Sequence, residues 1–235
     1  LPAQGQFAPP NKPRQWTLPA PQPAQIDDTL QGSAQAQGEL RGGLQAPAGK
    51  LTLQADGVRW SKALALRQLS ASSTFSTSRA SPATAASFDT LLDRLAGSLQ
   101  VGIDDLAWKQ GGKTLQLRHL QSEAQTTAGG KGPLSLKLQL QQLKLAGLSK
   151  TQQDITLSTA SLDVTGTREQ HLLALGVQGQ LPLGGADSPS AQQLLPLDMH
   201  LRATGGWFGA QQGWRGQITA LDNTARRREA LAAAS

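Results

Sequence analysis

The sequence predicts an all-β protein, a long and mostly antiparallel sheet with one apolar face. Three observations support this prediction: apolar and polar residues alternate through most of the chain, the alternating segments recur as an internal repeat, and a single segment has helical spacing. The clearest alternation is Leu134-Ser-Leu136-Lys-Leu138-Gln-Leu140, which places leucine on one face and Ser, Lys or Gln on the other. A period of two with one apolar face is typical of a half-buried antiparallel strand.

The same alternation recurs in segments on both sides of this one. Its parity slips by one residue between Leu140 and Leu143 and between Leu66 and Leu69, which indicates bulges or bends in the sheet. The other alternating segments are Leu51-Leu53-Ala55, Leu64-Leu66, Leu99-Val101-Ile103, Leu115-Leu117, Ile155-Leu157, Leu173-Leu175-Val177 and Leu195-Leu197-Met199-Leu201.

An internal repeat groups these strands into hairpins. Residues 51–60 are followed by a second alternating segment at 64–69, the same pattern returns at 99–108 and 115–120, and a third copy occupies 136–145 and 155–157. Each unit predicts a strand, a turn and an answering strand. Successive hairpins of one type stack into a long, quasi-one-dimensional sheet rather than a compact sandwich.

Three regions complete the predicted organisation. Residues 1–28 are proline-rich and predict an extended, loosely tethered segment. The repetitive β domain follows at 29–225 and is interrupted over 70–97 by a Ser/Thr/Ala-rich loop and a short helix near 87–96. In this helix Phe88, Leu91, Leu92 and Leu95 have helical spacing, with Ser87 as N-cap and Gly97 as the stop. Residues 226–235 form a basic tail.

The composition excludes several function classes. The chain has no cysteine, which excludes a disulfide framework, a thiolate zinc site and a cysteine nucleophile. The net charge is +6, but the basic residues are scattered apart from Arg226-Arg227-Arg228, and no aromatic residues flank that run, so we expect no nucleic-acid binding. No window reaches about 18 consecutive apolar residues, so we expect no membrane span in this chain. Because it opens at Leu1 rather than Met, we interpret it as a processed chain or an excised fragment.

One glycine-rich motif resembles a phosphate-binding loop. The stretch Ala107-Trp-Lys-Gln-Gly-Gly112-Lys113-Thr114 fits a relaxed form of that pattern, which requires a helix after the loop. Here Thr114 leads into the alternating segment at 115–117. We therefore expect a hairpin turn between two strands and no nucleotide site.

The ionisable residues predict no catalytic or metal site. His119, His171 and His200 lie far apart, without an acid at triad or metal-ligand spacing, and we expect solvated strand histidines. Asp27-Asp28 and Asp104-Asp105 are the paired carboxylates that acid–base chemistry would use. However, Asp104-Asp105 takes the place of Asp56-Gly57 in the repeat, which favours turn chemistry. We therefore predict no enzyme, no cofactor and no metal.

The aliphatic face is the informative feature, because rows of leucine must be covered by something. A second sheet or helices would cover them, or the sheet curls and leaves its lined face open to an apolar guest. A strand such as 134–140 spans about 20 Å, which is the length of a phospholipid acyl chain. At about 0.8 kcal/mol per buried CH₂, one long chain gains on the order of 10 kcal/mol on leaving water. A uniform aliphatic lining has no position that binds an acyl chain most tightly, so it suits movement of the chain along the sheet better than tight storage.

The predicted lining of this acyl-chain path consists of the inward-facing aliphatic residues, with the 134–140 leucines as its best representatives. Trp60, Trp108 and Trp214 are expected near the rim of the groove or between stacked units, with ordinary core packing as the alternative. The lining residues are Leu51, Leu53, Leu64, Leu66, Leu99, Val101, Ile103, Leu115, Leu117, Leu134, Leu136, Leu138, Leu140, Ile155, Leu157, Leu173, Leu175, Val177, Leu195, Leu197 and Leu201.

Two stretches of the sequence carry a family resemblance. The run Gly38-Glu-Leu40-Arg-Gly-Gly-Leu-Gln-Ala-Pro47-Ala-Gly-Lys-Leu51-Thr-Leu-Gln-Ala55 resembles the recurring G-x-L-x-G-x-L-x-x-P-x-x-x-L-x-L-x-A phrase of the TamB family. Members of this family are inner-membrane-anchored subunits of the translocation and assembly module, within the AsmA-like group. A G-T-x-x-x-H phrase at 166–171 and a W-x-G-x-(L/I)-x-x-L phrase at 214–221 are similar to phrases from the middle of such proteins, and the resemblance covers roughly residues 30–222.

The resemblance implies a mid-chain fragment of a periplasm-spanning protein, folded as a long U-shaped, taco-like sheet with an apolar interior. It also implies the passage of phospholipid between the inner and outer membranes, and partnership of the full-length protein with an Omp85-type outer-membrane barrel. The family's N-terminal membrane anchor and its C-terminal barrel-contacting region have no counterpart in these 235 residues. Direct contact of this segment with the barrel is accordingly not expected.

Two other functional classes remain open. An assembly or chaperone module for outer-membrane β-barrel proteins or autotransporters would use exposed sheet edges to pair with incoming strands. A secreted β-solenoid that only provides length would have a filled, dry interior and a more regular repeat than the unequal spacing of Trp60, Trp108 and Leu145.

Overall fold

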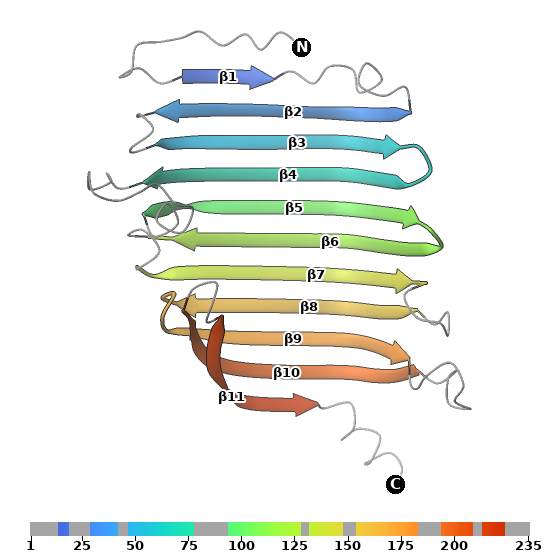
Figure 1. Ribbon diagram of the computed structural model, residues 1–235. Helices are drawn as coiled ribbons and strands as arrows, with labels where there is room; N and C mark the ends of the chain where they lie inside the picture. Colours follow the sequence, from blue (N-terminus) through green and yellow to red (C-terminus); the bar gives the residue numbers. More distant parts are fainter. Residues whose placement is uncertain are drawn as a thin grey trace, which may run out of the picture.

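A computed structural model of the chain shows one antiparallel sheet of 11 strands in sequence order, β1 to β11 (Figure 1). The structure describes residues 14–18, 29–41, 47–77, 94–127, 132–147, 154–182, 194–208 and 213–223. Within these ranges there is no helix, and none of them offers a helical segment able to cross a bilayer. The all-β and antiparallel predictions are confirmed for the described residues.

Each strand pairs with its neighbours in sequence, and all strands except the five-residue β1 have 10 to 16 residues. The strands are β1 (Arg14–Leu18), β2 (Leu30–Arg41), β3 (Ala48–Trp60), β4 (Leu64–Thr77), β5 (Leu95–Gln110), β6 (Lys113–Thr126), β7 (Leu134–Ala146), β8 (Ile155–Gly166), β9 (His171–Pro182), β10 (Leu194–Trp207) and β11 (Trp214–Asn223).

The predicted alternating segments all lie in strands, and the three repeat units are the hairpins β3–β4, β5–β6 and β7–β8. The glycine-rich motif is the turn of the β5–β6 hairpin, as expected. Gly111 and Gly112 have φ angles of +57° and +80°, which match the two positive φ angles of a type I′ turn. A helix after this loop, which a phosphate site requires, is replaced by β6.

Three sequence predictions about local structure need correction. Residues 70–77, predicted as loop, belong to β4, because Ser70, Ser72 and Thr74 supply the polar half of a regular alternation between β3 and β5. The predicted helix near 87–96 falls mostly outside the described residues, and its last two positions, Leu95 and Ala96, are strand in β5. Residues 14–18 of the predicted loose segment form β1, which pairs with β2.

The sheet is a single layer in the described residues. Only Ala55, Leu117 and Ala203 are buried among their apolar side chains, at 5%, 6% and 3% exposure, and no polar side chain is buried. The filled interior that the solenoid alternative predicts is therefore not present in these residues. The aliphatic side chains shield one another only partly within the sheet and leave a broad surface accessible to solvent.

Candidate functional site: the apolar face

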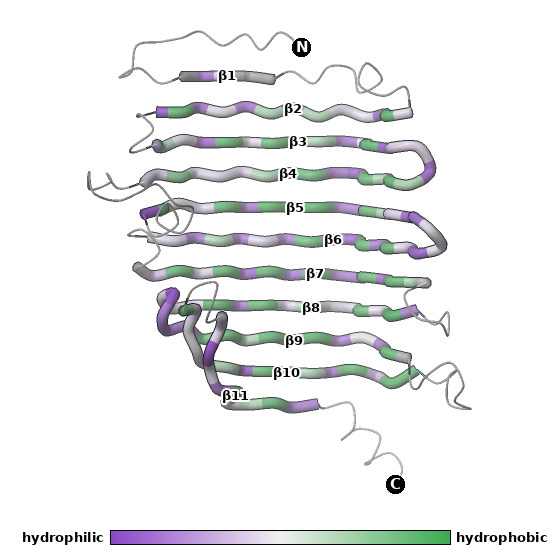
Figure 2. The backbone as a smooth tube through the Cα atoms, viewed as in Figure 1, coloured by the Kyte–Doolittle hydropathy of each residue, from purple (hydrophilic) through white to green (hydrophobic). Residues whose placement is uncertain are grey.

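The strand register sorts the side chains onto two faces, because paired residues in an antiparallel ladder share a face. One transverse row shows the result: Leu53 pairs with Ala71, Ala71 with Val101, and the row continues through Leu138 to Leu201. The neighbouring row on the opposite face contains Gln54, Ser70, Gly102, Gln121 and Gln139. Figure 2 shows the same alternation along the strands as changes between green and purple.

A line of extra residues crosses β3 to β8 and preserves this sorting. Asp104 pairs with Gln68 and Leu106 pairs with Leu66, so Asp105 lies opposite Arg67 between two regular pairs. The equivalent residues in the adjoining strands lie opposite one another in the same way. We call this line the bulge column; it consists of Gly57, Arg67, Asp105, Arg118, Gln142 and Ser158.

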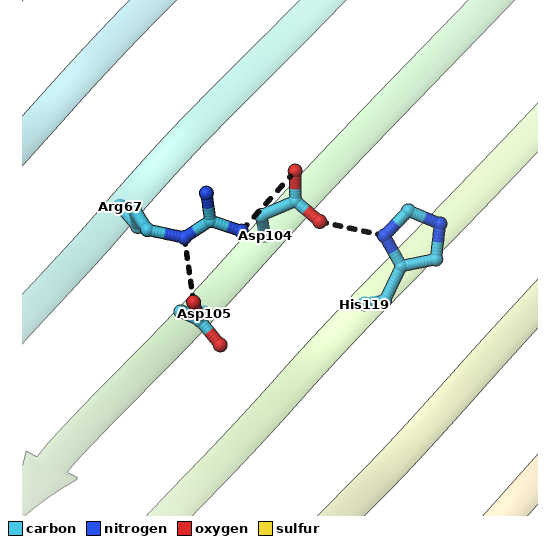
Figure 3. A network of polar contacts seen from close by, with 4 residues as sticks. All are labelled: Arg67, Asp104, Asp105 and His119. Carbon is cyan, nitrogen blue, oxygen red and sulfur yellow. Dashed lines mark hydrogen bonds and ion pairs between the residues drawn. The ribbon is translucent and has the colours of Figure 1, made fainter.

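Backbone angles and side-chain contacts show what the bulge column does. Gly57, Asp105 and Gln142, on alternate strands, have φ angles of +61°, +48° and +52°, and this left-handed backbone places two consecutive residues of the strand on the same face. Asp104 and Asp105 consequently lie on the same face although they are adjacent, and both contact Arg67 (Figure 3). Because two consecutive residues occupy the polar face, the next residue, Leu106, returns to the apolar face.

The one-residue shift in the apolar–polar alternation of the sequence thus keeps the apolar side chains on one face. Leu140 and Leu143, three residues apart, lie on one face on either side of Gln142, as do Leu66 and Leu69 on either side of the column. Register shifts between β2 and β3 and between β8 and β9 end the column at its two sides. At the first of these Gly32 is required, since a Cβ there would lie 2.6 Å from the carbonyl oxygen of Gly57.

The apolar face carries no charged side chain over a large area. From β2 to β11, between the row through Phe75 and the row through Trp108, every Lys, Arg, Asp and Glu of the described residues lies on the polar face. With neighbouring strands about 4.8 Å apart, a row from β2 to β11 is about 43 Å long. A row is therefore about twice the length of an acyl chain.

All of the predicted lining residues lie on this face, on both sides of the bulge column. The register also assigns Leu143 and Leu145, whose orientation the sequence left open, to the same face through their pairs Leu117 and Leu115. Trp60 and Trp108 occupy the last row, paired with Leu64 between them. Some members are substantially exposed, including Leu51 at 41% and Leu99 at 45%.

Trp214 and His171 form a specific contact at the other end of the face. The indole Nε1–H of Trp214 donates to His171 Nε2 at 2.7 Å, and the second ring nitrogen of His171 lies 3.2 Å from the carbonyl oxygen of Thr167. Trp214 reaches across β10 because Gly205 and Gly216 lie beneath it; a Cβ at either would come within 2.5 Å of the ring. His171 is therefore not the isolated solvated histidine that the sequence predicts.

The polar face carries a charged cluster at the bulge column. Arg67 Nε donates to Asp105 Oδ2 at 2.6 Å, Arg67 Nη2 lies 3.7 Å from Asp104 Oδ2, and His119 Nδ1 lies 2.6 Å from Asp104 Oδ1 (Figure 3). The hydrogen bond to Asp105, followed by the negative charges of Asp105 and Asp104, raises the pKa of the Arg67 guanidinium above its usual value. The turn predicted for Asp104-Asp105 is wrong: both residues lie in mid-strand. Asp27-Asp28 lies outside the described residues.

A trough of about 950 Å³ lies beside this cluster on the polar face. Its walls include Arg118, Gln142 and Ser158 of the bulge column on one side and Lys144 and Gln180 on the other. The described residues hold no group of three or more His, Asp or Glu placed to bind a metal ion. The apolar face is thus the larger and chemically more uniform candidate site.

Comparison with known protein families, curated proteins and solved structures returns no match. The function is therefore argued from the face itself. The sequence pattern predicted the face but not the partners of His119 and His171, nor the cross-strand backbone pairing of Trp207 with Trp214. The signal for that pair was present as a W-F-x₅-W spacing at 207–214.

Proposed function

We propose that this chain binds phospholipid acyl chains on its apolar face and conducts them along the rows of the sheet. In this proposal it is a non-enzymatic segment of a periplasmic bridge between the inner and outer membranes of a Gram-negative-type envelope. The observation that supports it most is the charge-free aliphatic face, which extends across the bulge column and over nearly all strands of a single-layer sheet.

An acyl chain suits this face better than a second protein layer for two reasons. The described residues supply no second sheet or helix to cover the leucines. The rows offer repeated aliphatic contacts without a charged side chain to cross, so a chain gains about 0.8 kcal/mol per buried CH₂ at one position after another. Nearly equal binding along the path favours movement over storage.

The proposal includes curvature of the sheet around the guest. Each bulge-column residue adds one position to the polar face only, and bulges bend strands and introduce sheet curvature. A sheet with a longer polar face bends toward its apolar face. This is the U-shaped, taco-like groove that the resemblance to the TamB family implies, and the periplasmic location and the Omp85-type barrel partner of the full-length protein belong to the same proposal.

Photo-crosslinking tests the proposed ligand. A photoreactive residue is placed at Leu136 or Leu138, with Lys137 as the matched control, because Lys137 pairs with Glu123 and Asp163 on the polar face. Capture of labelled phospholipid from both leucine positions and not from Lys137 supports the proposal. Capture of neither lipid nor peptide from the leucine positions would contradict it, because the face would then be covered by protein.

A second function is favoured by the edge of the sheet. The outer edge of β11 has no pairing strand among the described residues, and its apolar residues Ile218 and Leu221 are 62% and 63% exposed. An unpaired edge of alternating apolar and polar residues is a template for an incoming strand, as an assembly module for outer-membrane proteins requires. Crosslinks from Ile218 to peptide rather than lipid would favour this alternative.

A further inference from the structure

The hairpin joining β10 and β11 exposes a group of large aromatic side chains. Trp207 and Phe208 are each 47% exposed and Trp214 is 40% exposed. Trp207 and Trp214 are a directly paired couple that extends the apolar face beyond its last aliphatic row. Figure 1 shows these ends of β10 and β11 bending out of the plane of the neighbouring strands.

The chain has only five Trp and four Phe residues, so three aromatic side chains at one hairpin end are a concentration. These three side chains are not fully covered by packing within the sheet. Trp214 lies over Gly205 and Gly216 and donates to His171, and these contacts fix its ring with part of its surface in solvent. Trp207 leaves 47% of its surface exposed.

The backbone of this end is held in place. The Trp207 N–H donates to the carbonyl oxygen of Arg168 at 2.8 Å, and the Phe208 N–H donates to that of Gly213 at 3.1 Å. Gly206 lies against the backbone of Glu169, where a Cβ would come within 2.0 Å of the carbonyl oxygen. The aromatic group is therefore presented by a braced corner between β10 and the β8–β9 turn.

We propose that Trp207, Phe208 and Trp214 dock this end of the sheet onto the interfacial region of a phospholipid bilayer. Indole rings combine an apolar body with a polar N–H, and tryptophan is enriched where hydrocarbon meets headgroups. Arg215, the residue after Trp214, is exposed on the opposite face of β11, and the net charge of +6 over the whole chain favours an anionic surface. The aromatic group is continuous with the apolar face through Ile218, two residues beyond the Gly216 that pairs with Gly205.

This inference deepens the proposed function by naming where lipid would leave a bilayer and reach the sheet. The docking itself does not require that lipid moves along the rows. Bilayer binding and acyl-chain capture are consequently separate measurements on the same chain.

The test is binding to vesicles of phosphatidylcholine and phosphatidylglycerol in equal parts, measured by flotation. The double variant Trp207→Ser/Phe208→Ser removes two exposed rings and leaves Trp214 on His171. We expect the partition coefficient to fall at least tenfold, since the loss of only about 60 Å² of apolar contact already corresponds to about 1.4 kcal/mol. The matched control is Leu194→Ser, because Leu194 is 47% exposed at the opposite end of β10 and lies outside the apolar face.

The control should bind within about twofold of the parent chain, which corresponds to less than 0.5 kcal/mol. Equal losses in the two variants, an unchanged double variant, or a parent chain that does not float would each overturn the docking proposal. Lipid capture at Leu138 from detergent-dispersed phospholipid is measured in parallel. Capture without flotation overturns the docking alone, whereas flotation without capture supports the docking and contradicts the conducting face.

Discussion

Arg67 lies directly opposite Asp105 in the ladder between β4 and β5, and its Nε donates to the Asp105 carboxylate at 2.6 Å. The pair marks the place where each strand from β3 to β8 has one extra residue on the polar face. This insertion allows Leu106 to rejoin Ile103 on the apolar face. The continuity of the candidate lipid surface therefore depends on a row of polar residues behind it.

The left-handed backbone of the bulge column predicts a specific cost at Gly57. A Cβ at Gly57 would meet no atom within 4 Å, so Gly57→Ala changes only the backbone preference at φ +61°. We expect the free energy of unfolding to fall by about 1–2 kcal/mol in urea titrations. The control Gln54→Ala, at a regular polar-face position of the same strand, should change it by less than about 0.5 kcal/mol. Equal effects would show that the column carries no special strain.

The attachment of β1 depends on the small size of Gly38. A Cβ at Gly38 would lie 2.2 Å from the indole of Trp16, its pairing partner. Gly38→Ala should therefore displace Trp16 and increase deuterium uptake at residues 14–18, because the edge strand loses its packing. Gly102→Ala is the matched control, since its Cβ would meet only the movable hydroxyl of Ser70 at 2.9 Å. Unchanged uptake in Gly38→Ala would contradict the packing described for β1.

The hydrogen bond between Trp214 and His171 is open to a double-mutant cycle. His171→Phe keeps an aromatic ring but removes the acceptor, and we expect a loss of about 1 kcal/mol in the free energy of unfolding. In a Trp214→Phe background, which has no indole N–H to satisfy, the same change should cost less, and the difference is the coupling energy. Additive effects would mean that the two residues do not act together.

A charge in the rows should stop lipid passage without removing the strand. Leu136→Asp or Leu138→Asp places a carboxylate among aliphatic side chains, which an acyl chain can pass only at a high desolvation cost. We expect lipid transport to be lost in cells while strand content, followed by circular dichroism, is retained. The control is Gln139→Asp, on the polar face opposite Gln121. Normal transport with Leu138→Asp would contradict the conducting role.

Much of the fold was predictable because alternation is a local signal. The 134–140 leucines, the hairpin repeat and the Gly111-Gly112 turn need only sequence spacing. The slip from Leu140 to Leu143 was visible as well, but its consequence was not, because Gln142 is not a residue type that favours a positive φ angle, and even Asp, the type at position 105, adopts one only in a minority of cases. Asp56-Gly57 misled the prediction, since this dipeptide usually marks a turn rather than a mid-strand bulge.

The errors share a physical cause. Residues 70–77 were predicted as loop because Ser and Thr are common in loops, yet a sheet with one solvated face needs such residues on that face. The His171–Trp214 contact joins residues 43 positions apart and depends on two glycines in neighbouring strands. Contacts of this kind follow from register, which the sequence pattern does not specify across three strands.

The central claim is that the apolar face continues across the bulge column and contacts acyl chains on both sides of it. Photo-crosslinking from Leu140, Gln141, Gln142 and Leu143 in turn tests both parts at once. The account predicts capture of labelled phospholipid from Leu140 and Leu143 and from neither glutamine. Capture from Leu140 and Gln142 together, the pattern of a regular strand, or from none of the four positions would contradict it.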